Sequence, residues 1–293
     1  MCLDIAFYSA LQLIDDYFPD LTHDGEIGFD LDMGMHFLAL GHNRYPVILR
    51  ENGHYHRKYF EWGIIAEYMD TPEKIKAMRK SMVNARSEKI LVDKRSFWNR
   101  IRRQRCLIPV TGIYEHREVK GWKNKIPYHI QLKGRPMFCL PGLYHYNTKM
   151  PSDPETGEMR GMFTLITRSA NSVMRQIHNS GDNAFRMPLF LPKEMEMEWL
   201  RPDLTEEDIA RLLDYEMPAD QIVYDPVFSI RGRSPRPDGK PKNAFFAHPN
   251  LPPLGEDALP PGNGSPGNAL PPGNDSPGNA PLPGKGGGPV LMD

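Results

Sequence analysis

Short apolar runs separated by Gly, Pro or polar residues fill most of the first 230 positions, and they predict strands rather than long helices. The residues between the runs supply the turn signals that bound each strand. The polar stretch 145–161 predicts a hairpin or an excursion between two strands. The predicted strands are 2–8, 36–40, 45–50, 106–117, 126–132, 136–144, 162–168 and 188–191.

Helix signals are fewer and lie between these strands. Asp70-Thr71-Pro72 predicts a capped helix to about Met82, and Ser96 is a cap for a helix to about Arg103. Strands outnumber helices and do not alternate with them. We therefore expect an α+β domain around an antiparallel, barrel-like curled sheet with peripheral helices. Further helices are predicted at 169–176, 193–200 and 205–215, the last with the capping pattern Thr205-x-x-Asp208.

The composition changes at about Pro249. The last 45 residues contain 12 Pro and 10 Gly, and an eleven-residue unit occurs at 260–270 and again at 271–281. Such a segment has too little apolar surface to offset its chain entropy. We predict a folded domain at 1–248 and a disordered Pro/Gly-rich repeat tail at 249–293. A docking role for the tail stays open beside the simpler interpretation of a solvated tail.

Charge is unevenly distributed within the predicted domain. Residues 1–32 hold eight Asp or Glu and no Lys or Arg. Residues 79–105 hold ten Lys or Arg against Glu88 and Asp93, a local balance of +8. This cluster fits a polyanion such as nucleic acid, and it equally fits a solvated helix face. The whole-chain charge of −1 favours neither interpretation.

The sequence also excludes several classes of protein. No stretch of about 18 apolar residues occurs, so no membrane span is predicted. The N-terminus carries Asp4, Asp15 and Asp16 and lacks a basic region, unlike a signal peptide. Three cysteines are too few for a disulfide scaffold, so we expect a reducing, cytoplasmic location. Zinc-ligand spacings, a P-loop and a dinucleotide-binding motif are not found, and no cofactor is predicted.

Cys2 is the first candidate for chemistry. It follows Met1, and removal of Met1 would give a free α-amine beside a thiol. The pKa of an α-amine is about 8 and that of a thiol about 8.5, so both have a nucleophilic fraction near neutral pH. Such a 1,2-aminothiol condenses with an aldehyde to a Schiff base and then to a thiazolidine. A small buried hydrophobic residue in a first strand is the alternative.

The remaining candidates lie in three short motifs and one Trp. In NARSE (84–88), Asn84, Arg86 and Glu88 would share one side if extended, which suits phosphate or polar-ligand recognition. In GIYEH, Glu115 follows a Gly turn and could be a general acid or base. In the segment 177–188, His178 could transfer protons and Arg186 precedes an apolar strand. Trp62 in FEWGII could stack on a base or lie in the core. Each residue also has an ordinary structural alternative.

Together these motifs identify a resemblance. Cys at position 2, WG, NARSE, R-C-L-I-P-x-x-G-x-Y-E and a late IH followed by RMP resemble the SOS-response-associated peptidase (SRAP) family over about residues 1–230. The resemblance implies a mixed α/β domain that loses its own Met1 and binds single-stranded DNA at abasic sites. It implies a covalent thiazolidine between the N-terminal Cys and the ring-opened sugar. We expect a monomer in the cytoplasm, associated with the nucleoid when bound to DNA.

The resemblance also assigns roles by motif. Cys2 matches the crosslinking nucleophile, Asn84 the active-site Asn, and Glu115 the motif carboxylate. His178 matches the late active-site His. The DNA-contacting positions are matched by Arg86, Arg186 and Trp62.

This chain departs from the family pattern at several positions. It begins MCLD rather than MCGR, so Asp4 replaces a basic residue, and His116 stands where a Trp is usual. WGLIP is WGIIA at 62–66, and 179–185 separates His178 from RMP by more residues than usual. Two alternatives stay open: a noncatalytic single-strand binder with the same fold, and an N-terminal-nucleophile amidohydrolase.

Overall fold

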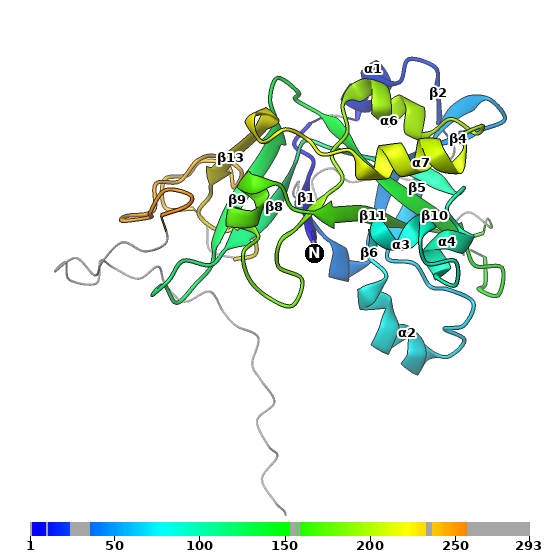
Figure 1. Cartoon of the computed structure of the whole chain (residues 1–293), viewed down its shortest axis with the longest axis horizontal. Helices are drawn as coiled ribbons and strands as arrows, with labels where there is room; N and C mark the ends of the chain where they lie inside the picture. The colour runs from blue at the N-terminus through cyan, green and yellow to red at the C-terminus, as the bar shows by residue number, and fades with distance from the viewer. Residues whose placement is uncertain are drawn as a thin grey trace, which may run out of the picture.

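The computed structural model describes residues 2–9, 11–23, 36–152, 157, 159–232 and 236–256. Two sheets hold most of the strands (Figure 1). The first has the order β13-β9-β8-β1-β3, and every neighbouring pair in it is antiparallel. Its strands are β1 (Asp4–Ala6), β3 (His36–Leu38), β8 (Gly112–Arg117), β9 (Ile126–Leu132) and β13 (Ile222–Pro226).

The second sheet has eight strands in the order β12-β11-β10-β7-β4-β5-β2, with β6 paired in parallel to β11. A short parallel pairing of β11 with β5 brings distant strands of this sheet together, so the sheet is curled. Its strands are β2 (Leu21–His23), β4 (Arg44–Glu51), β5 (His54–Trp62), β6 (Asn84–Arg86), β7 (Arg105–Val110), β10 (Phe138–Tyr146), β11 (Gly161–Ser169) and β12 (Arg186–Pro188).

The helices are short and peripheral. In Figure 1, α2, α3 and α4 lie on one side of β6, and the five-stranded sheet lies on the other. The α-helices are α1 (Gln12–Tyr17), α2 (Pro72–Met78), α3 (Glu88–Leu91), α4 (Phe97–Arg100), α5 (Ser172–Ile177), α6 (Lys193–Trp199) and α7 (Glu206–Asp214). Three 3-10 turns are η1 (Ala39–Gly41), η2 (Arg79–Ser81) and η3 (Ala219–Gln221). The predicted α+β fold with a curled, largely antiparallel sheet is confirmed.

The predicted helix caps are found where the motifs place them. The Thr71 side chain accepts a hydrogen bond from the Lys74 N–H before α2, and Thr205 and Asp208 form a reciprocal capping box before α7. Ser96 caps α4, but that helix ends at Arg100 rather than Arg103. These caps satisfy N–H groups that have no partner within the helix.

The predictions missed α1, β2, α3, β5 and β13, and the strand predicted at 188–191 is instead β12, which ends at Pro188. Strand β5 has the sequence HYHRKYFEW. It lacks an apolar run because most of its residues are polar, although its last three residues are buried. The segment after β13 also packs on the domain beyond residue 248. Arg117 is fully buried, and it donates 2.8 Å hydrogen bonds to the carbonyls of Pro252 and Pro253. The packed chain therefore extends past the predicted boundary. The tail from 257 onward lies outside the described residues.

Candidate active site

Cys2 lies in the interior, directly before β1. Its side chain is 1% exposed, and its Sγ lies 3.8 Å from the carbonyl oxygen of Asp4. The register that pairs Asp4 with Tyr114 brings Cys2 to the Glu115 end of β8. Burial raises the pKa of the Cys2 thiol, and the nearby Glu115 and Asp4 carboxyls add to that effect. The thiol is therefore protonated at neutral pH in this structure.

Asn84 holds the Cys2 backbone. Its Nδ2 donates a 2.8 Å hydrogen bond to the Cys2 carbonyl, across 82 positions of sequence. β6 places it there because Asn84 pairs with Leu165 of β11 in the parallel register. The Asn84 Oδ1 atom is buried and makes no hydrogen bond within the described chain. A buried acceptor without a partner costs free energy, so this atom is available to a substrate hydroxyl or amine.

Glu115 is the buried carboxyl of the site. It is 4% exposed, and burial raises its pKa from an ordinary 4.5 to about 8. Its Oε1 atom is buried without a hydrogen-bond partner in the described part of the chain. Its Oε2 atom lies 3.9 Å from the Nε2 atom of His178. Glu115 is consequently protonated at neutral pH and can donate a proton there.

His178 completes the group. It follows the last residue of α5, and its Nδ1 atom lies 2.8 Å from the carbonyl oxygen of Arg186. Burial lowers its pKa from 6.5 to about 4, so the imidazole is neutral at neutral pH. The Nδ1–H tautomer donates to that carbonyl and leaves Nε2 as an acceptor facing Glu115. The pair therefore consists of a protonated carboxyl and a neutral base.

The long spacing between His178 and RMP does not separate them in space. The Phe185 N–H donates a 2.7 Å hydrogen bond to the His178 carbonyl, which closes the intervening residues into a loop. The next residue, Arg186, starts β12 and presents its carbonyl to the imidazole. His178 and Arg186 thus occupy one site despite the seven additional residues 179–185.

The two candidate arginines differ in exposure. Arg86 is exposed at the end of β6, and its guanidinium bonds the side-chain oxygen of Asn183 at 2.9 Å. Arg186 is 9% exposed and forms two hydrogen bonds with the Glu88 carboxylate, with a third to the Thr167 carbonyl. Arg86 is therefore the more solvent-accessible arginine of the two, whereas Arg186 fixes the wall beside His178.

Glu88 does not extend the line of Asn84 and Arg86. The strand ends at Arg86, and Glu88 begins α3. The helical turn directs Glu88 to Arg186 instead, and that pairing lowers the pKa of its carboxyl against the effect of burial. The predicted single line of amide, guanidinium and carboxylate is wrong for this reason.

Trp62 lies in the core. It is 2% exposed, its ring stacks on Phe163 at 5.8 Å, and its Nε1 atom donates to the Val83 carbonyl at 2.9 Å. Gly63 follows at φ +105°, where a Cβ would meet His42 Nδ1 at 2.8 Å. Glycine is needed here for both backbone and space. The core alternative for Trp62 is thus the observed one, and the indole supports the strand that carries Asn84.

Asp4 has a partner that sequence reasoning did not find. It is 2% exposed, and its carboxylate pairs with His36 at 2.7 Å and with the Nε atom of Arg231 at 3.1 Å. These partners lower its pKa against the effect of burial. Arg231 lies 227 positions from Asp4 in the sequence, so no local pattern links the two residues. The one available signal was that a buried carboxylate requires a cationic partner. The Arg231 side chain is 49% exposed, and its guanidinium also lies close enough to Glu115 to act on that carboxyl electrostatically.

Arg231→Gln should lower the free energy of unfolding by about 1–2 kcal/mol at neutral pH, less than for a fully buried pair because the arginine is half-exposed. The pKa of Asp4 is lowered on folding, so this contribution is present above its ordinary pKa and lost as the pH falls through the lowered value. Urea unfolding at neutral and acidic pH measures it. Arg201→Gln, which breaks an exposed pair with Asp203, is the control and should change little. Equal effects of the two variants at neutral pH would contradict the assignment.

The basic cluster is only partly neutralised within the protein. Arg79 pairs with Glu61, and Arg102 pairs with Glu206. Arg105 is buried and donates to backbone carbonyls, including that of Trp199. Six exposed cations of the cluster form no ion pair with the described residues: Lys80, Arg86, Lys89, Arg95, Arg100 and Arg103.

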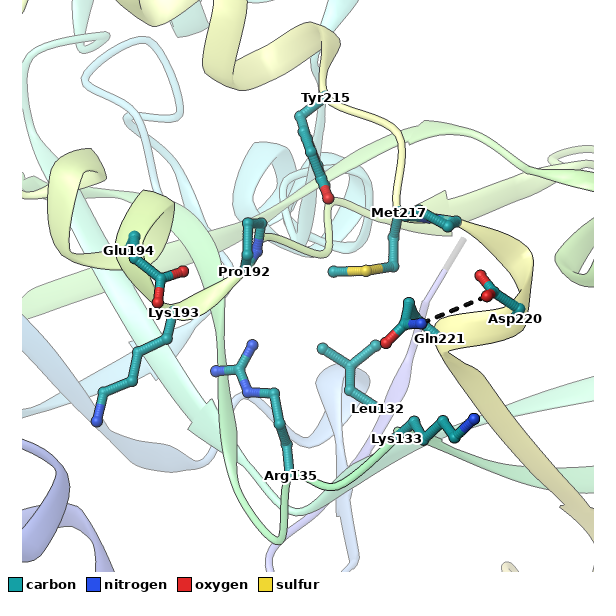
Figure 2. A pocket seen from close by; sticks show the side chains of 11 residues that line it. Leu132, Lys133, Arg135, Pro192, Lys193, Glu194, Tyr215, Met217, Asp220 and Gln221 are labelled. Carbon is teal, nitrogen blue, oxygen red and sulfur yellow. Dashed lines mark hydrogen bonds between the residues drawn. The ribbon is translucent and has the colours of Figure 1, made fainter.

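A separate hollow of about 590 Å³ lies between the β9–β10 turn, the start of α6 and η3 (Figure 2). Arg135, Lys193 and Asp220 are among its lining residues, and none of the candidate site residues lines it. Within the described ranges, no group of three or more His, Cys, Asp or Glu side chains could hold a metal ion. No helix among the described residues is long and apolar enough to cross a membrane.

Comparison with known families fits this geometry. Residues 29–230 match the family described as SOS response associated peptidase (SRAP). The chain belongs to the SRAP family. The matched span contains every candidate site residue except Cys2, which precedes it: Trp62, Asn84, Arg86, Glu115, His178 and Arg186.

Individual SRAP relatives agree. The chain is 35% identical to the abasic site processing protein YoqW of Bacillus subtilis over 170 residues, 58% of this chain and 68% of that protein. It is 28% identical to the abasic site processing protein YoaM of the same species over 237 residues, 78% of this chain and 92% of that protein.

Solved structures support the fold. A Bacteroides thetaiotaomicron protein superposes with a TM-score of 0.65 at 30% identity, covering 78% of this chain and 92% of that chain. A Bordetella bronchiseptica protein superposes with a TM-score of 0.60 at 21% identity, covering 78% of this chain and all of that chain, which concerns the fold alone.

Proposed function

We propose that this SRAP protein processes abasic sites in single-stranded DNA by forming a covalent thiazolidine between Cys2 and the abasic sugar. The names of its relatives support the substrate. The observation that carries the chemistry is the convergence of Cys2, Asn84, Glu115 and His178, from four distant segments, on one buried point. Removal of Met1 would free the α-amine there.

The first step is opening of the sugar. An abasic deoxyribose exchanges between a closed hemiacetal and an open aldehyde, and opening needs a proton at the ring oxygen and loss of one from the hydroxyl. Glu115 is the proton donor, because it is the protonated member of the pair. Neutral His178 is the acceptor. This reverses the roles that residue type alone suggests, since burial acts in opposite directions on an acid and on an imidazole.

The second step joins the Cys2 amine to the aldehyde carbon. The amine must be neutral to attack, and an α-amine has a pKa of about 8. Burial raises the pKa of Glu115 to about 8, toward the ordinary pKa of an α-amine, so Glu115 is suited to exchange a proton with the amine. Carbinolamine formation and loss of one water give the Schiff base: the proton that His178 took up in the first step leaves with this water, and Glu115 takes back a proton from the nitrogen. Asn84 fixes the Cys2 carbonyl while this occurs, which holds the nucleophile in place.

The third step closes the ring. The Cys2 sulfur adds to the imine carbon, a C–S bond forms, and the nitrogen takes up the proton that the thiol loses. The net reaction is aldehyde plus aminothiol to thiazolidine plus water. The raised pKa of the Cys2 thiol means that its proton must be taken as the sulfur attacks, and neutral His178 is the base available in the same group. The peptidase activity that we propose is confined to removal of Met1 by the protein itself.

DNA binding should depend on salt through Arg86. Each phosphate contact on a single strand contributes about 0.7 to the slope of log K against log salt. Arg86→Ala should therefore weaken binding and reduce that slope by about 0.7. Anisotropy titrations with a labelled single strand across a salt series measure it. The comparison is Arg186→Lys, which alters a buried ion pair and should leave the slope unchanged. An unchanged slope for Arg86→Ala would contradict the phosphate contact.

The proposed function is tested by mixing the mature protein with single strands that carry one true abasic site. We expect a covalent product that survives a denaturing gel. A tetrahydrofuran analogue has no aldehyde, so it should bind without giving that product. A covalent product with the analogue, or none with the abasic strand, would contradict the proposal.

A further inference from the structure

Phe185 is an exposed aromatic residue beside the candidate site that none of the assigned roles uses. It is the last residue of the loop 179–185, and its side chain is 42% exposed. Its N–H donates to the carbonyl of His178, and its own carbonyl accepts from the N–H of Ala170 at 2.9 Å. Two hydrogen bonds thus fix the Phe185 backbone directly against the His178 end of the site.

The backbone conformation of Phe185 is unfavourable for its side chain. Its φ is +61°, in the left-handed region that Gly and Asn enter readily and bulky residues rarely do. An exposed ring gains little from burial that would offset this strain. Strained residues of this kind concentrate at ligand-binding and catalytic sites. A glycine would adopt this backbone conformation at a lower free-energy cost. The presence of an aromatic ring here therefore indicates a role for the side chain itself.

The ring is held from one side by a cation. The guanidinium carbon of Arg175, on α5, lies 4.5 Å from the centre of the Phe185 ring. Such cation–π stacking restrains the ring and adds positive charge next to it. Aromatic rings combined with Arg are the usual surface on which proteins stack the bases of single strands.

The rest of the loop is tied down at both ends. Two hydrogen bonds join Asn179 to the backbone of Glu118. The Glu118 N–H donates to the Asn179 Oδ1 atom at 2.8 Å, and the Asn179 Nδ2 atom donates to the Glu118 carbonyl at 2.9 Å. Asn183 accepts from Arg86, the candidate phosphate contact. The loop therefore joins the β8 side of the site to the β6 side, and Phe185 is its last residue. In Figure 1 this loop is the yellow-green segment that descends between β8 and β6.

We propose that Phe185, backed by Arg175, is a stacking platform for the base next to the abasic position in the bound strand. The inference rests on the proposed function, because it needs a single strand in this site. An abasic nucleotide has no base of its own to stack, so a neighbouring base is the one that can fix the strand in register. Phe185 belongs to the segment 179–185, which lengthens the spacing between His178 and Arg186 in this chain.

The test uses single strands with a tetrahydrofuran abasic analogue and 2-aminopurine on either its 5′ or its 3′ side. Phe185→Gly removes the ring and suits the positive φ, and Phe185→Trp keeps an aromatic surface. We expect Phe185→Gly to weaken binding by about 5- to 150-fold, the range for loss of one stacked base. Quenching of 2-aminopurine should be lost on one side of the analogue only. Phe185→Trp should retain both the affinity and the one-sided quenching.

The outcomes separate the two proposals. Wild-type protein that crosslinks, together with a Phe185→Gly variant that binds and quenches as wild type does, would overturn the platform alone. Wild-type protein that neither binds nor crosslinks abasic strands would overturn the proposed function and the platform with it. Equal loss of 2-aminopurine quenching on the 5′ and 3′ sides in Phe185→Gly would also contradict the platform. It would show that the whole bound strand has become less ordered.

Discussion

Cys2→Ala should abolish the covalent product with abasic single strands while leaving binding of the tetrahydrofuran analogue nearly unchanged. The thiazolidine needs a sulfur and an amine on one residue, and Cys2 is the cysteine whose carbonyl is held by Asn84 beside Glu115 and His178. Alanine preserves a small buried side chain at a position that is 1% exposed, so folding should survive. A denaturing gel of protein with abasic DNA measures the product.

Two variants separate sulfur from amine and from the other thiols. Cys2→Ser keeps the α-amine, so it should give a Schiff base that borohydride traps, without the stable product. Cys106→Ala removes a thiol that is fully buried elsewhere in the core, and it should crosslink normally. A stable crosslink in Cys2→Ala, or its loss only in Cys106→Ala, would show that another group is the nucleophile.

Glu115→Gln should slow crosslinking by about 10²- to 10⁴-fold, the usual contribution of a general acid or base, with DNA affinity retained. The amide keeps the size of the carboxyl but cannot donate or accept the proton that ring opening and amine attack require. Single-turnover time courses with excess protein measure the rate, and anisotropy measures the affinity. Glu118→Gln is the matched control, because that carboxylate is exposed and near the same strand end. Equal losses of rate and affinity in Glu115→Gln would contradict a proton-transfer role.

The same substitution has a defined effect on stability. The pKa of Glu115 is raised by burial, so its contribution to stability is complete below its ordinary pKa of 4.5 and is lost as the pH rises through about 8. Glu115→Gln removes this loss. Its stability relative to wild type should therefore increase between those two pH values, by up to about 5 kcal/mol. Urea unfolding across this pH range measures it, and a constant difference would show that Glu115 is not protonated in the folded protein.

Local signals allowed much of the site to be predicted. Caps and apolar runs indicated most of the elements around it, and motif order indicated Cys2, Asn84, Glu115 and His178. The structure brings these four together, and their chemical roles stay predictions. What local pattern could not give was protonation, because the pKa values of Glu115 and His178 depend on burial by the whole fold.

The remaining differences come from long-range contacts. Arg231 reaches Asp4 across the molecule, and Glu88 turns into α3 to meet Arg186. Arg117 holds the carbonyl of Pro252 in a segment whose composition alone predicts disorder. A buried ion pair or a guanidinium bound to backbone carbonyls leaves no periodic pattern in the sequence. Such partners can be found only once the fold has brought them together.

The central claim is most directly tested by intact mass spectrometry of the purified chain, alone and after mixing with abasic single-stranded DNA. The account predicts a protein lacking Met1 and, after mixing, an adduct equal to protein plus DNA minus one water, mapped to Cys2 by peptide sequencing. A mature protein that binds the strand yet shows no adduct would contradict the account and favour a noncatalytic single-strand binder. In that case the MCLD start and the 179–185 loop would be the differences from the family pattern to examine first.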